Sequence, residues 1–296
     1  MSSALPVSPT DCAAPPLASS GSSTSSLSPS PPPPKDVVQG LQQEIQNLQA
    51  KDELTVMKAA ASIVMFATMP EVESHLEASV PQLLAILNGD YSLHVKKNAC
   101  AALTSIMNAS AMLYHIVAET SNLLKGLLIF LEPSVQDVGL KINVLAALCA
   151  LAQHEHGIPL MKDAGVDDML LSLLEDSVDA NMEEELVDTF CAMAVHEDMR
   201  PCLLQKGAVY KLAAHLASES PEICVRVLLA LGMLCGSSVE GQLELAKAEG
   251  AVKALVKLML SNDHDIKSIA RDLFGTLSSN QQTRPVVEQM MRSNEN

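Results

Sequence analysis

An apolar pattern returns about every 43 residues along this chain, and that period restricts the folds open to it. Five segments begin at Val80, Leu123, Val166, Val209 and Val252 and read VPQLLAIL, LLKGLLIF, VDDMLLSL, VYKLAAHL and VKALVKLM. Apolar residues recur mostly three, four and seven positions after each start. This spacing predicts one helix per segment, with one buried stripe.

A second apolar motif lies roughly halfway through each unit. It is centred on Leu103, Leu148, Phe190, Leu231 and Phe274, and another apolar residue follows three positions later. A unit of this length cannot bury its apolar faces alone, so the units are expected to stack on one another. The sequence therefore predicts an all-α solenoid.

Glycines mark the same place in successive units, at Gly165, Gly207 and Gly250. The segments CALAQHEHGIPLMKDAG and CAMAVHEDMRPCLLQKG, which end at the first two of these glycines, align over their whole length. In these features the chain resembles the armadillo repeat family over residues 53–292. The resemblance implies a right-handed superhelix with three helices per unit; HEAT repeats, with two helices per unit, are the alternative.

The resemblance does not extend to the peptide-clamping ladder of importin-α. In that protein an Asn on each third helix holds the backbone of the bound peptide, and a Trp one turn earlier packs on its side chains. The matching Asn positions in this chain are Ser105, Ala150, Ala192, Met233 and Thr276, and the chain contains no Trp. Binding of nuclear-import cargo in the usual way is therefore not expected.

Residues 1–35 form a tail rich in Ser and Pro that is predicted to be disordered, because it has no hydrophobic period. Its prolines at 29–34 favour a polyproline II segment that a proline-recognition domain could bind. Ser8, Ser28 and Ser30 each precede Pro and are candidate phosphorylation sites. A flexible tail with no dedicated partner is the alternative.

A short helix is predicted over residues 36–52, where Val38, Leu41, Ile45 and Leu48 recur at three and four residues. It is interpreted as a cap on the first repeat, with a dimerising coiled coil as the alternative, so a monomer is favoured over a dimer. The repeat domain then occupies residues 53–296, as one partial repeat followed by five.

The charge and the cysteine content restrict the kinds of partner that the chain is expected to bind and the cell compartment in which it is expected. The formal net charge is −16, and residues 1–35 carry only Asp11 and Lys35, so the excess lies on the repeats. Nucleic acid and anionic membranes would be repelled. The seven cysteines form no Cys-x-x-Cys pair, and no uncharged run of 18 apolar residues occurs. The sequence favours a cytoplasmic location, with the nucleus possible and the chloroplast a lesser alternative.

No motif for catalysis or for a cofactor is present, so no catalytic residue, cofactor or metal is expected and the chain is not predicted to be an enzyme. The closest approach to a metal cluster is His154-Glu155-His156. Residues two apart on a helix point to different sides, so the two histidines are not expected to share a metal. The tripeptide also comes where a helix is predicted to end, and it is interpreted as a surface loop.

The most unusual stretch is acidic. Between Asp163 and Met199 there are twelve acids and no Lys or Arg to pair with them. If the armadillo alignment holds, Glu185 and Asp188 face the concave groove. The positions equivalent to Glu185 or Asp188 in the other repeats supply the remaining candidate partner-binding residues, which are Asn98, Asn143, Arg226 and Asp272.

Two functions are compatible with these features. The first is a non-catalytic scaffold that binds a basic or mixed segment of a partner protein through an acidic concave groove. The alternative is a regulator of a chaperone ATPase or a small GTPase that speeds nucleotide release, since armadillo-type proteins include such exchange factors. The sequence favours the scaffold.

Overall fold

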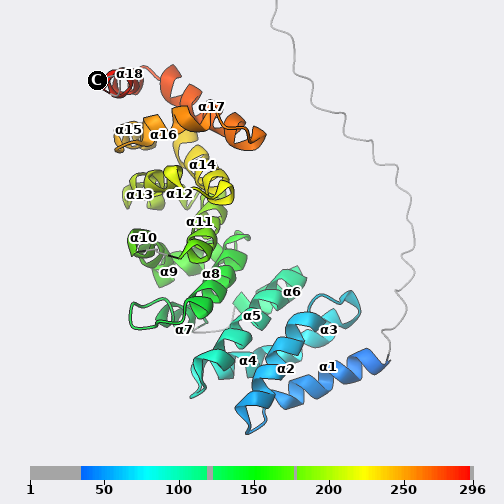
Figure 1. The fold of residues 1–296 in the computed structure, drawn as a ribbon. Coiled ribbons are helices and arrows are strands. Elements are labelled where there is room, and N and C mark those ends of the chain that lie inside the picture. Colours follow the sequence, from blue (N-terminus) through cyan, green and yellow to red (C-terminus); the bar gives the residue numbers. More distant parts are fainter. Residues whose placement is uncertain (1–34, 119–122, 177–178, 294–296) are drawn as a thin grey trace, which may run out of the picture. The chain divides into compact units, whose positions relative to one another are not determined.

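The structure is a computed structural model and describes residues 35–118, 123–176 and 179–293, which fold into helices joined by short turns, without any strand. Helices follow one another as a stack from α1 to α18 (Figure 1). The predictions made for residues 1–34, including Ser8, Ser28, Ser30 and the proline run, lie outside this described part.

Each repeat contains three helices, here called first, second and third. The third helices are α5 (Leu93–Ala109), α8 (Val138–Ala152), α11 (Ala180–Val195), α14 (Pro221–Gly236) and α17 (His264–Ser279). The second helices are α4 (Val80–Asn88), α7 (Leu123–Ile129), α10 (Val166–Asp176), α13 (Ala208–Ala214), which η3 (His215–Ala217) extends, and α16 (Ala251–Leu258). The first helices are α6 (Ala111–Ala118), α9 (Gly157–Ala164), α12 (Arg200–Gln205) and α15 (Val239–Lys247).

The two ends of the stack differ from this plan. The first repeat has three short segments in place of a first helix, namely η1 (Pro70–Val72), α3 (Glu73–Leu76) and η2 (Glu77–Ser79). Before them come α1 (Lys35–Asn47) and α2 (Glu53–Phe66), and α18 (Arg284–Ser293) ends the described chain. Three helices per unit agree with the armadillo expectation and not with the two of a HEAT repeat.

Helix α2 and the third helices form a continuous row in the order α2, α5, α8, α11, α14 and α17, each packed on the next. The predicted buried stripes are confirmed. The residues that open the five segments are at most 4% exposed, and among the second-motif residues only Phe274 is more than slightly exposed. The core is therefore shared between neighbouring units, as stacking requires.

Three glycines make the turn between first and second helices. Gly165, Gly207 and Gly250 have φ of 70°, 73° and 75°, in the left-handed region that other L-residues enter at a cost of about 1–2 kcal/mol. The N–H of Gly165 donates to the carbonyls at the end of α9, as in a helix C-terminal glycine cap. The glycine signal in the sequence thus marks a real backbone requirement.

Acids also precede α2 and three of the five third helices. The side chains of Asp52, Asp137, Asp179 and Asp263 accept backbone N–H groups in the first turns of α2, α8, α11 and α17. Such caps satisfy donors that a helix leaves unpaired at its start. Part of the acidic excess therefore serves helix formation.

Helix α1 packs on α2, the first helix of this row, and on the short segments η1 and α3. Leu41 is fully buried and Leu48 is 2% exposed, within a single copy of the chain. The exposed positions of α1 include Gln39, Gln43 and Gln46. These contacts are those that a cap would make, and the choice between a cap and a dimerising helix stays a prediction.

Candidate protein-binding site

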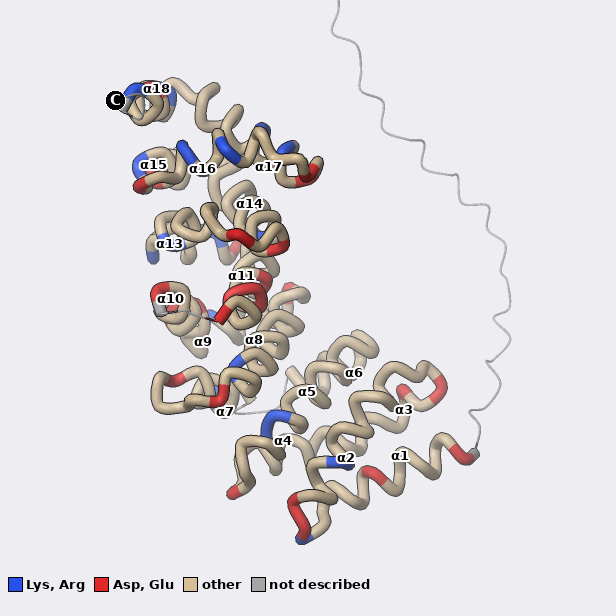
Figure 2. The backbone as a smooth tube through the Cα atoms, in the orientation of Figure 1, with Lys and Arg blue, Asp and Glu red and all other residues tan. Residues whose placement is uncertain are grey.

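The candidate residues lie on one face of the third-helix row, here called the third-helix face. It is defined by two positions on each helix, all of them half-buried or exposed: Asn98, Ala101, Asn143, Ala146, Glu185, Asp188, Arg226, Leu229, Ile269 and Asp272. Acidic positions gather on α11, beside α14 (Figure 2). The middle of the face is therefore where charge is concentrated.

Three acids of α11 form the centre of the face, and Glu184, Glu185 and Asp188 are here called the α11 acid cluster. Arg226 of α14 reaches two of them. Its Nε lies 2.7 Å from Asp188 Oδ1, and its Nη1 lies 3.3 Å from Glu184 Oε1. The structure therefore places Glu185, Asp188 and Arg226 on one face, and Arg226 there is an ion-pair partner of Asp188 and Glu184.

Glu185 differs from its two neighbours because no salt bridge to its carboxylate occurs within the described residues. Partial burial raises the pKa of Glu185, and the nearby carboxylates of Asp188 and Glu184 raise it further, against the lowering effect of Arg226. The charged form of such a carboxylate is stabilised by any additional cation placed beside it. Glu185 is the acceptor that the cluster leaves open.

The two asparagines of the face have structural partners. Asn98 Nδ2 donates to the Met57 carbonyl at 3.1 Å, and Asn143 Nδ2 donates to the Lys97 carbonyl at 2.9 Å. Each amide therefore ties its third helix to the preceding one. Each bond uses one of the two N–H donors of its amide.

Asp272 is exposed on α17, and α14 lies between it and α11 in the row. The structure therefore does not bring Asp272 into the α11 acid cluster. A residue that the sequence did not single out, Glu184, belongs there instead, because it shares Arg226 with Asp188. Its spacing of one helical turn before Asp188 was the available signal.

The interpretation of the acidic stretch as unpaired is wrong. Basic side chains of the next repeat neutralise many of its acids, through the pairs Lys206–Asp167, Lys206–Asp168, Lys211–Glu175, His215–Glu183 and the two of Arg226. These partners lie 30 or more residues further along the chain. A window along the sequence misses them because stacking, not sequence distance, brings repeats together.

Two thiols border the acid cluster without chemical activation. Cys149 of α8 and Cys191 of α11 occupy equivalent positions, and burial, aided by the charge of Asp188, raises the pKa of each thiol to about 11. A thiol with such a pKa is protonated at neutral pH and is a poor nucleophile.

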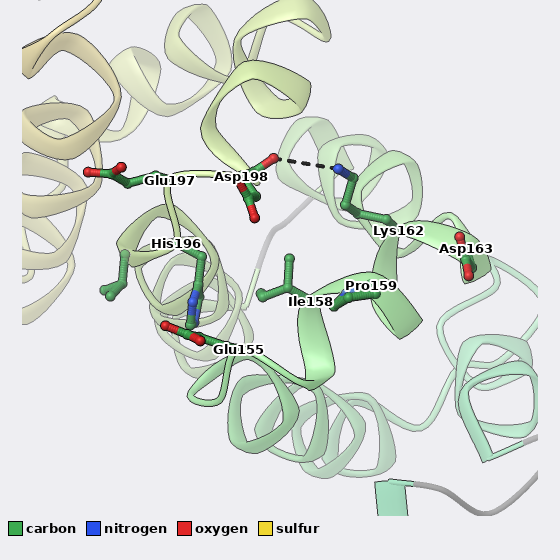
Figure 3. Close-up of a pocket in the computed structure, with 9 residues that line it drawn as sticks. Glu155, Ile158, Pro159, Lys162, Asp163, His196, Glu197 and Asp198 are labelled. Carbon is green, nitrogen blue, oxygen red and sulfur yellow. Dashed lines mark hydrogen bonds between the residues drawn. The ribbon is translucent and has the colours of Figure 1, made fainter.

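An open cleft of about 660 Å³ lies at the C-terminal end of α11, between α9 and the turn that joins α11 to α12. Ile158, Pro159 and the exposed Val195 give it an apolar floor, and Figure 3 shows Lys162 beside Asp198, whose carbonyl accepts from Nζ at 3.5 Å. His196 Nε2 lies 2.7 Å from the carbonyl of Ala152, at the end of α8. The cleft therefore adjoins the third-helix row at its helix ends.

The histidine tripeptide lies in an exposed turn, as predicted, with the His154 ring 4.1 Å from that of Tyr114. Within the described ranges, no group of three or more His, Cys, Asp or Glu side chains is arranged to hold a metal ion. In the same ranges no single helix is long and apolar enough to cross a membrane; one pair, Glu53–Phe66 with Pro70–Asn88, meets the length and composition test but is bent by 110°.

Known structures identify the fold. The chain is similar to the designed armadillo repeat protein YIII(Dq)4CqI, with 23% identity and a TM-score of 0.71, over 80% of this chain and 99% of that one. It is also similar to computationally designed armadillo repeat proteins for modular peptide recognition (22%, TM-score 0.70, 80% and 99%). A third match is the designed armadillo repeat protein YIII(Dq.V1)4CPAF in complex with peptide (KR)4 (21%, TM-score 0.70, 80% and 98%).

No family model matches the sequence. The fold comparison nevertheless confirms the predicted architecture, and the chain has the armadillo repeat fold. Its departure from the Asn and Trp ladder is thus a difference of side chains on a shared backbone.

Proposed function

We propose that this chain is a non-catalytic scaffold that binds a basic or mixed segment of a partner protein on its third-helix face, at α11. The observation that carries the proposal is the carboxylate of Glu185, which is half-buried, next to two other carboxylates and without a salt bridge in the described chain. A Lys or Arg side chain is the ligand group that such a site attracts most.

The similarity to designed armadillo proteins supports the same proposal. One of them is in complex with the peptide (KR)4, a ligand made of Lys and Arg. The shared fold supplies a row of third helices on which a segment can lie. The side chains that contact the ligand depend on the sequence of each protein, and in this chain they are the acids of α11.

The test uses the full chain and a fluorescently labelled (KR)4 peptide, with binding followed by anisotropy. We expect Glu185→Gln to weaken binding about five-fold, because one carboxylate contact in a partly screened site is worth about 1 kcal/mol. Glu249→Gln is the matched control: Glu249 is exposed in the turn before Gly250, away from the face.

Binding should also weaken as the salt concentration rises, since the attraction is between charges near the surface. Charge reversal at Asp188 is a poor test, because a Lys there would lie beside Arg226 and disturb the fold. Equal affinities for the wild type, Glu185→Gln and Glu249→Gln would refute the site. Absence of binding by the wild type at low salt would refute the basic-ligand proposal itself.

A further inference from the structure

Arg226 already occupies most of the α11 acid cluster. It extends from α14 across to α11, and its side chain is 28% exposed. One guanidinium nitrogen is within hydrogen-bond distance of Asp188, and a second contacts Glu184. Arginine is suited to this role because its planar donor fork can serve two carboxylates at once.

The effect of this contact is to divide the cluster into used and unused acceptors. Two of the three carboxylates face a positive charge supplied by the chain itself, whereas Glu185 has no salt bridge to any residue that the structure describes. Helix α11 packs on α8 as well as on α14, so the cluster lies between these two helices. Burial raises the pKa of Cys149 on α8, and the charges of Asp188 and Glu185 raise it further. The open acceptor is therefore Glu185, within the row between α8 and α14.

Resting on the proposed function, we propose that Arg226 determines the specificity of this site: as a resident counter-ion on Asp188 and Glu184, it leaves Glu185 as the one acceptor for a partner's cation. The site then takes a single basic side chain rather than a run of them. A second Lys or Arg of the ligand would have to displace Arg226 from its partners.

The decisive variant is Arg226→Gln, which removes the resident charge and keeps a side chain able to donate a hydrogen bond. The probes are (KR)4 and a peptide of the same length with one Lys among Gly and Ser. For the wild type we expect the two affinities to lie within about three-fold of each other. For Arg226→Gln we expect (KR)4 to bind about five-fold tighter than to the wild type, with a steeper loss in salt.

Arg271→Gln is the matched control, since Arg271 is exposed on α17 and makes no salt bridge in the described chain. It also removes one positive charge, so a gain that merely reflects net charge would appear in both variants. Arg226→Lys is the second variant. Lysine keeps the charge but is a point donor, so it should release one carboxylate and give a smaller gain.

The outcomes separate this inference from the proposed function. If (KR)4 binds the wild type and Glu185→Gln weakens it, but neither Arg226 variant binds more tightly while retaining wild-type helicity, the specificity role is overturned and the scaffold proposal stands. An equal gain in Arg271→Gln overturns it as well. If no variant binds either peptide, the proposed function fails first.

Discussion

Replacement of Asp167 by Asn should be among the more damaging single charge changes in the chain. Asp167 is the second residue of α10, the helix that follows Gly165, and it is 1% exposed although it is an acid. Its Oδ2 accepts from Lys206 Nζ at 2.6 Å and from Cys202 Sγ at 3.0 Å. This buried pair joins α10 to the segment after α12, and so one repeat to the next.

The magnitude follows from what the substitution leaves behind. Removing one partner of a fully buried ion pair costs about 3–5 kcal/mol. Here Lys206 is 32% exposed and keeps a second carboxylate, Asp168, at 2.8 Å, so the remaining charge is partly compensated. We expect about 2 kcal/mol for Asp167→Asn, and less than about 1 kcal/mol for Asp168→Asn, whose side chain is 69% exposed.

The assay is urea unfolding of the two variants beside the wild type. With a slope of about 3 kcal/mol per M for a chain of this size, the Asp167→Asn midpoint should fall by about 0.7 M. Asp168→Asn contacts the same lysine and is the matched control. Equal shifts for both variants would show that burial of Asp167 adds nothing, and the reasoning would be refuted.

The same site predicts a pH dependence. Burial alone raises the pKa of Asp167, but the hydrogen bonds from Cys202 and Lys206 and the charge of Lys206 outweigh it and hold the pKa below its ordinary value. An acid with a lowered folded-state pKa stabilises the fold above its unfolded pKa of about 3.9. That contribution is lost as the pH falls through the lower, folded value, so the gap between wild type and Asp167→Asn should narrow there.

Five further substitutions test the packing, the turns and the acid cluster by urea unfolding. Leu148→Ala should cost about 2–5 kcal/mol, since Leu148 is fully buried in α8, whereas Leu229→Ala, at a side chain 41% exposed, should cost less than about 1 kcal/mol. Gly250→Ala should destabilise by about 1–2 kcal/mol through its positive φ alone, while Gly275→Ala, inside α17 and with no atom within 4 Å of a new Cβ, should stabilise by up to about 1 kcal/mol. Glu185→Gln should stabilise slightly at pH 7, because a raised acid pKa means that the fold disfavours the charged form; the gain should vanish below about pH 4, where the unfolded chain is protonated too.

The fold could be predicted from the sequence because its determinants are periodic. Buried residues that open an apolar segment, such as Val166, and turn glycines, such as Gly207, recur at one spacing. The first kind marks a packing requirement and the second a backbone conformation that repeats from unit to unit. The third helix per unit was a family expectation, since the short first helix, as in α12, carries too few residues for a period to be read. The disorder of residues 1–34 stays a prediction.

The site could be predicted only in part. Equivalent positions on successive third helices follow from the repeat, and they predict that Glu185, Asp188 and Arg226 share one face, where the structure places them. The repeat does not predict the direction in which each side chain points. Asn143 could have faced a ligand or the neighbouring helix, and its bond to the Lys97 carbonyl depends on the offset between α5 and α8.

The acidic stretch and the basic residues that follow it are best understood together. The acids Asp167, Glu175 and Glu183 lie in the third repeat, and their partners Lys206, Lys211 and His215 lie in the fourth. In a solenoid, stability depends on the interfaces between neighbouring units, so charges segregated into adjacent repeats strengthen that one boundary. They also favour correct stacking there, because like charges would face each other if a repeat packed out of order.

The proposed ligand site follows from that arrangement rather than from the number of acids. A carboxylate paired across the boundary attracts a partner weakly, since the neighbouring cation cancels its field, whereas Glu185 keeps its attraction because Arg226 is committed to Asp188 and Glu184. The useful measure of such a surface is therefore the charge left after stacking. By that measure the acidic stretch contributes one principal acceptor, Glu185, to the third-helix face at α11. Six of its other acids pair with side chains of the next repeat, and Asp179 caps α11.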